Sequence, residues 1–245
     1  MNRSKHGNAV KLFRRSTMKY KIDMFRKKCF LDMQNAKIIN YGVAFVDSVY
    51  NGIQGNADIT NYKNPFSEIN SLVLKGALGL QFIETSAPKD MNKQWQNGDF
   101  VITNQFFPPK FLITQNNMVN NKNETTEMVK KIIDFANLLP QIGKIGINFS
   151  LVIEKDVIVK DVVLKEKIAN EFSGISFTLE KEINEVQKLN LQIAGAKNIE
   201  TNQNGVFVQA NFDNKVTSEN TIDKILNQNY FAILEQKINA VFGDL

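Results

Sequence analysis

The chain has few of the side chains that catalyse covalent chemistry. Its 245 residues include one cysteine, Cys29, and one histidine, His6. One cysteine excludes an internal disulfide, and one cysteine with one histidine excludes a zinc site of the usual Cys/His type. Nucleophilic catalysis by a Ser/His/Asp or Cys/His group needs an imidazole beside the nucleophile. We therefore predict no catalytic residues, no metal ligands and no cofactor, and we interpret the chain as a binding protein rather than an enzyme.

Long hydrophobic runs and phosphate-binding loops are also missing. No segment approaches the roughly 18 apolar residues of a membrane helix, and the N-terminal region has no signal-peptide pattern. Neither GxxxxGK[ST] nor GxGxxG occurs in the sequence, so no common nucleotide-binding loop is present. Together with the single cysteine, these absences predict a cytoplasmic protein without a membrane span.

The net charge of +5 comes from one end of the chain. Residues 1–28 hold ten Lys or Arg against Asp23, a net charge of +9, and the other residues hold 20 basic against 24 acidic side chains, a net charge of −4. A nucleic-acid partner is therefore indicated only for this basic segment. The cations that we consider for phosphate contacts are Arg14, Arg15, Lys19, Lys21, Arg26, Lys27 and Lys28.

The start of the chain lacks any apolar periodicity. We predict that residues 1–17 form a disordered basic tail, and Met1 and Met18 both remain open as translation starts. We expect residues 18–156 to form a first α+β unit and residues 157–245 to form a second one. The two units are expected to pack as one globular body.

Apolar spacing predicts the elements of these units. The first unit is expected to hold strands at 71–84, 99–107 and 110–115 and a helix at 124–139. The second is expected to hold strands at 174–182, 189–195 and 205–213 and a long C-terminal helix at 220–242. Further strands are predicted at 37–47 and 144–154, and further helices at 20–34 and 162–172.

These patterns predict an α+β fold of two units, each a three-stranded antiparallel sheet covered by a helix. The same order of elements in the two units makes a pseudo-duplication one interpretation. A soluble sheet of this kind offers edges and polar faces to a partner.

The only tryptophan, Trp95, falls in a segment that the sequence predicts as a long loop, residues 85–98. Long loops in compact domains are often functional, and an exposed Trp is a frequent anchor for a protein partner. We therefore consider Trp95 and its neighbour Lys93 for partner binding. The alternative is a Trp that folds back over the edge of a sheet.

Carboxylates with a nearby lysine are the one catalytic arrangement that needs no histidine. Asp213 and Lys215 have the spacing of a metal-dependent nuclease, although an Asn-rich turn has the same appearance. The main hypothesis is a non-catalytic binding or assembly protein, one component of a multi-protein bacterial or phage system, with a protein partner or self-association. The alternative is nucleic-acid binding through the basic segment, and the third hypothesis is a nuclease around Asp213 and Lys215.

Overall fold

The computed structural model describes residues 36–47, 63–85, 92–105, 109–116, 122–138, 142–154, 175–197 and 202–242. The strands are β1 (Ala36–Asp47), β2 (Ile83–Glu84), β3 (Asn92–Asn97), β4 (Phe100–Gln105), β5 (Lys110–Asn116), β6 (Ile142–Glu154), β7 (Ser176–Asn184), β8 (Gln187–Lys197) and β9 (Asn204–Lys215). The helices are the 3-10 turn η3 (Pro65–Glu68) and the α-helices α2 (Ser71–Leu78), α3 (Lys122–Phe135), α6 (Ile222–Leu226) and α7 (Tyr230–Phe242).

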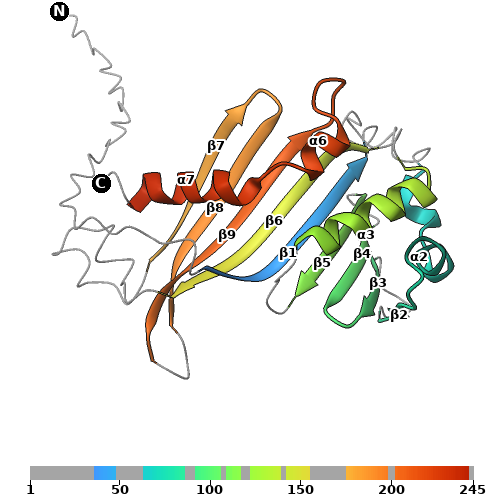
Figure 1. Ribbon diagram of the computed structural model, residues 1–245, viewed down its shortest axis with the longest axis horizontal. Coiled ribbons are helices and arrows are strands. Elements are labelled where there is room, and N and C mark those ends of the chain that lie inside the picture. The colour runs from blue at the N-terminus through green and yellow to red at the C-terminus, as the bar shows by residue number, and fades with distance from the viewer. Residues whose placement is uncertain are drawn as a thin grey trace, which may run out of the picture.

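All nine strands in the described part of the chain join in a single antiparallel sheet. Their order is β2-β3-β4-β5-β1-β6-β9-β8-β7. The centre of the sheet is the pair β1 and β6, in which Tyr41 lies opposite Phe149 and Val43 lies opposite Ile147. The strands β2 to β5 extend the sheet on the β1 side, and β7 to β9 extend it on the β6 side (Figure 1).

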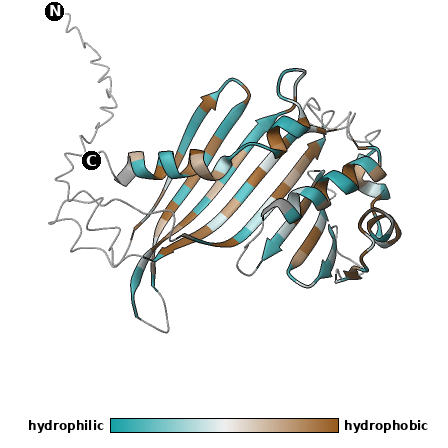
Figure 2. Ribbon diagram, viewed as in Figure 1, coloured by the Kyte–Doolittle hydropathy of each residue, from teal (hydrophilic) through white to brown (hydrophobic). Residues whose placement is uncertain are grey.

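The alternation of apolar and polar residues gives the sheet two different faces. Along β6, every second side chain from Ile145 to Ile153 is buried, while the side chains between them are partly exposed. Figure 2 shows the same alternation on neighbouring strands. We call the apolar side the inner face and the other side the outer face. Because side chains of a strand point alternately to opposite faces, this pattern needs a cover on one face only.

The described α-helices supply that cover (Figure 1). Helix α3 contacts β1 and β5, and it buries the apolar stripe of Met128, Val129, Ile132 and Ile133. Helix α7 buries Tyr230, Leu234 and Ile238, which recur every four residues. The ring of Tyr230 lies 4.9 Å from the ring of Phe212 on β9. One hydrophobic core therefore runs between the inner face and the helices.

The prediction of two separate three-stranded units is wrong. β1 and β6 pair along their whole length and merge all strands into one sheet, so no two-unit fold is present among the described residues. The predicted strands at 37–47, 99–107, 110–115, 144–154, 174–182, 189–195 and 205–213 and the predicted helix at 124–139 correspond to described elements. The unit boundary at 156/157, residues 1–17 and the helices predicted at 20–34 and 162–172 lie outside the described residues.

Two further elements differ from the sequence-based prediction. Most of the strand expected at 71–84 is helix α2: the side chain of Asn70 accepts hydrogen bonds from the N–H groups of Leu72 and Val73, and Gly79 ends the helix at a φ of 68°. These caps satisfy free backbone groups at both ends of the helix. The prediction of one long C-terminal helix is also wrong, because this segment forms two helices, α6 and α7, separated by residues 227–229. None of the helices in the described ranges combines the length and the apolar character needed to cross a membrane.

Two glycines allow a contrasting test of the packing. A Cβ at Gly205, on β9, would lie 2.8 Å from the main-chain oxygen of Ile153 on the paired strand, and a Cβ at Gly76, in α2, would lie 2.5 Å from Cζ of Phe135. Phe135 is exposed and its ring is free to turn away, whereas the strand is fixed by its ladder. We expect Gly205→Ala to cost about 2 kcal/mol of unfolding free energy, and Gly76→Ala to be neutral or stabilising because Ala is the better helix former. Chemical denaturation of both variants measures this, and equal losses would contradict the packing described.

Candidate functional site

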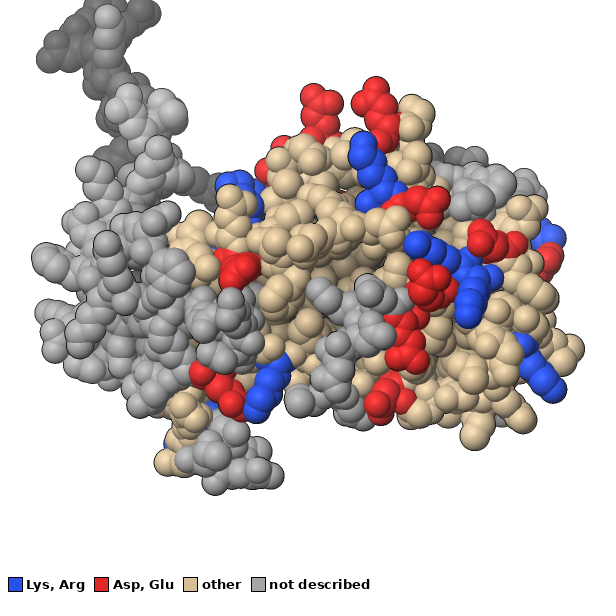
Figure 3. Space-filling model, viewed as in Figure 1, with Lys and Arg blue, Asp and Glu red and all other residues tan. Residues whose placement is uncertain are grey.

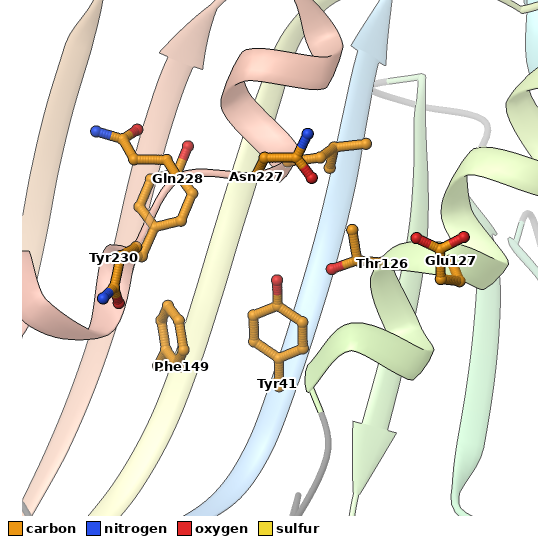
Figure 4. Close-up of a pocket in the computed structure, with 9 residues that line it drawn as sticks. Tyr41, Thr126, Glu127, Phe149, Asn227, Gln228 and Tyr230 are labelled. Carbon is orange, nitrogen blue, oxygen red and sulfur yellow. The ribbon is translucent and has the colours of Figure 1, made fainter.

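A cleft opens on the inner face, above the centre of the sheet. It lies between α3 and the junction of α6 with α7, and its volume is about 440 Å³, within the range of small-ligand sites. Figure 4 shows side chains from the sheet at the base and from the helices on both sides. The lining residues are Tyr41, Thr126, Glu127, Phe149, Leu226, Asn227, Gln228, Asn229 and Tyr230.

The base of the cleft is aromatic. Tyr41 on β1 and Phe149 on β6 are register partners, so their side chains stand side by side, and their ring centroids are 5.0 Å apart. Phe212 on β9 continues the row, 6.3 Å from Phe149. These rings are almost fully buried. The base is therefore a rigid apolar platform, and the polar groups of the cleft lie above it.

The rim on the α6–α7 side consists of three consecutive amides, Asn227, Gln228 and Asn229. Helix α6 ends here, and the N–H of Asn227 closes its last turn on the carbonyls of Asp223 and Ile225. Helix α7 then begins with Oδ1 of Asn229, which accepts a hydrogen bond from the N–H of Ala232 at 3.2 Å. Asn is a favoured residue at such helix ends, so the sequence itself places the break.

The oxygens of all three rim amides are engaged. Oδ1 of Asn227 accepts from Nζ of Lys130 at 3.3 Å, and Oε1 of Gln228 accepts from Nε2 of Gln187 at 2.9 Å. Oδ1 of Asn229 caps α7. Since each amide also carries an NH₂ group with two donors, the rim presents mainly donors to the cleft.

The rim on the α3 side is close to neutral. The carboxylate of Glu127 lies 3.6 Å from Nζ of Lys130, one turn along the same helix. Figure 3 shows acidic and basic side chains interspersed over this face, among the residues described. An exposed pair of this kind contributes little stability, but it removes any strong preference of the cleft for an ion.

A buried polar network lies beneath Gln228. Nε2 of Gln187 donates to Oδ1 of Asn214 at 2.6 Å as well as to Gln228, and Nδ2 of Asn214 donates to the carbonyls of Ile145 and Phe212. Two buried polar atoms of this region have no hydrogen-bond partner: the hydroxyl of Tyr230 and Oε1 of Gln187. Tyr230 and Gln187 are each 3% exposed. Buried polar atoms without a partner are rare and costly.

Burial raises the pKa of both tyrosines at the cleft. For Tyr41 the hydrogen bond with Thr126 opposes this effect, and for Tyr230 the nearby Tyr41 adds to it. Side-chain interactions with Asn214 and Gln187 lower the pKa of Tyr230, although no hydrogen bond of standard geometry joins either side chain to its hydroxyl. The neutral phenols are therefore the forms that this environment favours.

These pKa shifts predict a loss of stability in alkali. The folded-state pKa values lie above the unfolded value of about 10, so the folded chain holds these protons to higher pH. The contribution of these two protonated phenols to the free energy of unfolding is fully present below about pH 10, and it is lost as the pH rises further. Tyr230→Phe removes one titrating group and should make the fall shallower, as measured by urea midpoints between about pH 8 and 11. Parallel curves for the two proteins would contradict the raised pKa of Tyr230.

The residues that the sequence suggested for partner binding lie elsewhere. Trp95 is in β3, not in a loop, and is 0% exposed in the core, so the structure does not offer its side chain to a partner. Lys93 is partly exposed on the same strand. The seven cations proposed for nucleic-acid contacts lie outside the described residues, and their role stays a prediction.

The nuclease candidates lie on β9, away from the cleft. Asp213 faces the outer side of the sheet, where Nζ of Lys144 is 4.0 Å from its carboxylate. The pKa of the exposed Lys188, on the neighbouring strand, is raised mainly by Glu182 and slightly by Asp213. No group of three or more His, Cys, Asp or Glu residues suited to hold a metal ion occurs within the described ranges. The nuclease hypothesis therefore stays a prediction without a described ligand set.

The cleft residues were not singled out from the sequence. The local signal that marks them is the run of three amides Asn227–Gln228–Asn229, but Leu226 and Tyr230 on either side keep the four-residue spacing of a helix, so the apolar pattern shows no break. Comparisons of the chain with protein-family models, with curated proteins and with solved structures found no match.

Proposed function

We propose that this protein is a non-catalytic binding or assembly component whose protein partner is held in the cleft between α3 and the α6–α7 junction. The observation that supports this proposal is the composition of the cleft: an aromatic base, a rim of side-chain amides and a neutral Glu127–Lys130 pair. Amides and phenols bind through hydrogen bonds, and none of them is a strong nucleophile or base at neutral pH.

The position of the cleft also favours binding. Its base is held by paired strands at the centre of the sheet. One wall is helix α3, and the other is the short link between α6 and α7, whose flanking residues Leu226 and Tyr230 are packed in the same core. A site on such elements keeps its geometry without a partner, which lowers the entropy cost of association. The rim donors then select a partner that offers hydrogen-bond acceptors.

Site-specific photo-crosslinking in cells tests the proposal. A photoreactive amino acid at Asn227 should crosslink a discrete partner, whereas the same residue at Gln192, exposed on the outer face, should not. Glu127→Trp fills the cleft from an exposed position of α3 and should abolish the crosslink. Lys131→Trp is the matched control, since Lys131 is exposed on the same helix and does not line the cleft.

The outcomes separate clearly. A crosslink from Asn227 that Glu127→Trp removes and Lys131→Trp preserves supports binding in the cleft. Equal crosslinking from Asn227 and Gln192, or a crosslink that survives Glu127→Trp, overturns it. Thermal melting of each variant confirms that the substitutions leave the fold intact.

A further inference from the structure

The polar network beneath the rim is closed by a surface side chain. Gln187 is buried, yet one of its two acceptors is Oε1 of Gln228, an exposed residue in the non-helical link between α6 and α7. The other acceptor is Oδ1 of Asn214, which is buried. The Nδ2 group of the same side chain donates to two main-chain carbonyls, so Asn214 is held in place. Gln228 is therefore the member of this network that an incoming group can replace at the lowest cost.

Two further groups near Gln228 lack partners. The hydroxyl of Tyr230 can donate a hydrogen bond, and Oε1 of Gln187 can accept one. Together with the Nε2 donor of Gln187, the site needs an oxygen that accepts and an N–H that donates. A group with only acceptors, such as a carboxylate, leaves Oε1 of Gln187 unsatisfied, and an apolar group leaves all three unsatisfied.

A primary carboxamide carries both functions on adjacent atoms. We infer that the partner inserts a carboxamide side chain, of Asn or Gln, in place of the side chain of Gln228. This inference rests on the proposed function. Its oxygen accepts from Nε2 of Gln187 and from the hydroxyl of Tyr230, and its NH₂ group donates to Oε1 of Gln187. Gln228 is the internal stand-in for this ligand in the unbound protein.

The surroundings match a neutral ligand of this size. Glu127 and Lys130 offset each other's charge at the opposite wall, so the cleft does not favour an ion. The volume of about 440 Å³ holds one side chain with its flanking main chain. The free NH₂ groups of the rim are then available to the carbonyl groups of that main chain.

Three small probes test this inference on the full chain. The first is N-acetyl-glutamine methylamide, the second is the glutamate analogue, and the third is the norleucine analogue, which keeps the peptide carbonyls but has an apolar side chain. Binding is followed by NMR titration of the backbone amide signals of residues 126 and 227–230. We expect the glutamine probe to bind at least about 5-fold more tightly than either analogue, since each analogue leaves a buried polar group unpaired.

Substitutions give two effects of opposite sign. Tyr230→Phe should weaken binding of the glutamine probe by about 2- to 10-fold through the loss of one hydrogen bond, and it should fold well because that hydroxyl has no partner to lose. Gln228→Ala should strengthen binding, because the internal competitor is gone. Gln236→Ala, an exposed glutamine on α7, is the matched control and should change nothing.

The failures of the two proposals are distinguishable. Equal binding of the three probes, weaker binding to Gln228→Ala, or no effect of Tyr230→Phe overturns the carboxamide inference. If none of the probes shifts the cleft signals while the crosslink from Asn227 still depends on an open cleft, the carboxamide inference fails and the proposed function stands. If that crosslink also fails, the proposed function falls as well.

Discussion

Replacing Trp95 by alanine should lower the free energy of unfolding by about 4 kcal/mol, the largest effect that we expect for a single side chain here. Trp95 is 0% exposed and lies opposite Ile102 of β4 and Glu84 of β2. Removing the indole leaves a large cavity near the edge of the core, where β2 has only two residues to close it. The melting temperature should fall by roughly 8–16 °C for a chain of this size.

Two controls define the origin of that loss. Leu72→Ala removes an apolar side chain that is 80% exposed and should change the unfolding free energy by less than about 0.5 kcal/mol. Trp95→Phe retains a ring and removes the indole N–H, which has no partner in the core, so its loss should be smaller than that of Trp95→Ala. A Trp95→Ala variant with unchanged melting would show that the indole does not pack as described.

Replacing Asn214 by aspartate should cost about 3 kcal/mol although the side chains have the same shape. Nδ2 of Asn214 donates to the carbonyl of Ile145 at 3.0 Å and to that of Phe212 at 3.1 Å. A carboxylate has no donor, so its oxygens would face two carbonyl oxygens in the core. Lower pH should recover part of the loss, because burial favours the protonated, uncharged carboxyl group.

The control for this substitution is on the same strand. Asn211 lies on the outer face of β9, partly exposed, and Asn211→Asp should change stability by no more than about 0.5 kcal/mol. Urea unfolding at pH 7 and at pH 5 compares both variants with the parent protein. Equal losses at the two positions, or a loss for Asn214→Asp that does not shrink in acid, would contradict the network.

Strand positions were most predictable where every second side chain of a strand is buried. The alternation at 144–154 and 205–213 reports directly on the inner and outer faces of β6 and β9. The helix α2 was missed because its run of Leu, Val and Ala is short and fits a buried strand equally well. The features that favour a helix over a strand here are the N-cap at Asn70 and the left-handed Gly79 at the C-terminus. In a sequence, such caps are a weaker signal than apolar periodicity.

The single sheet could not be predicted from local patterns. Whether β1 joins β6 depends on a pairing between residues that are 95 to 117 positions apart, and spacing within one strand carries no information about its neighbours. The cleft was missed for a related reason. Its walls come from α3 and from the α6–α7 junction, which become neighbours only after both have packed on the sheet.

The central pairing also sets the order in which this chain can fold during synthesis. Tyr41 and Phe149 are 108 residues apart in sequence, so β1 has no neighbour on the β6 side until Phe149 has left the ribosome. Hairpins such as β3–β4 and β7–β8 close over a few residues, whereas the middle of the sheet must close a long loop. A nascent chain stalled before β6 would pair β1 with β5 alone, and the edge of β1 that faces β6 would stay exposed. Such chains are the natural substrates of a holding chaperone.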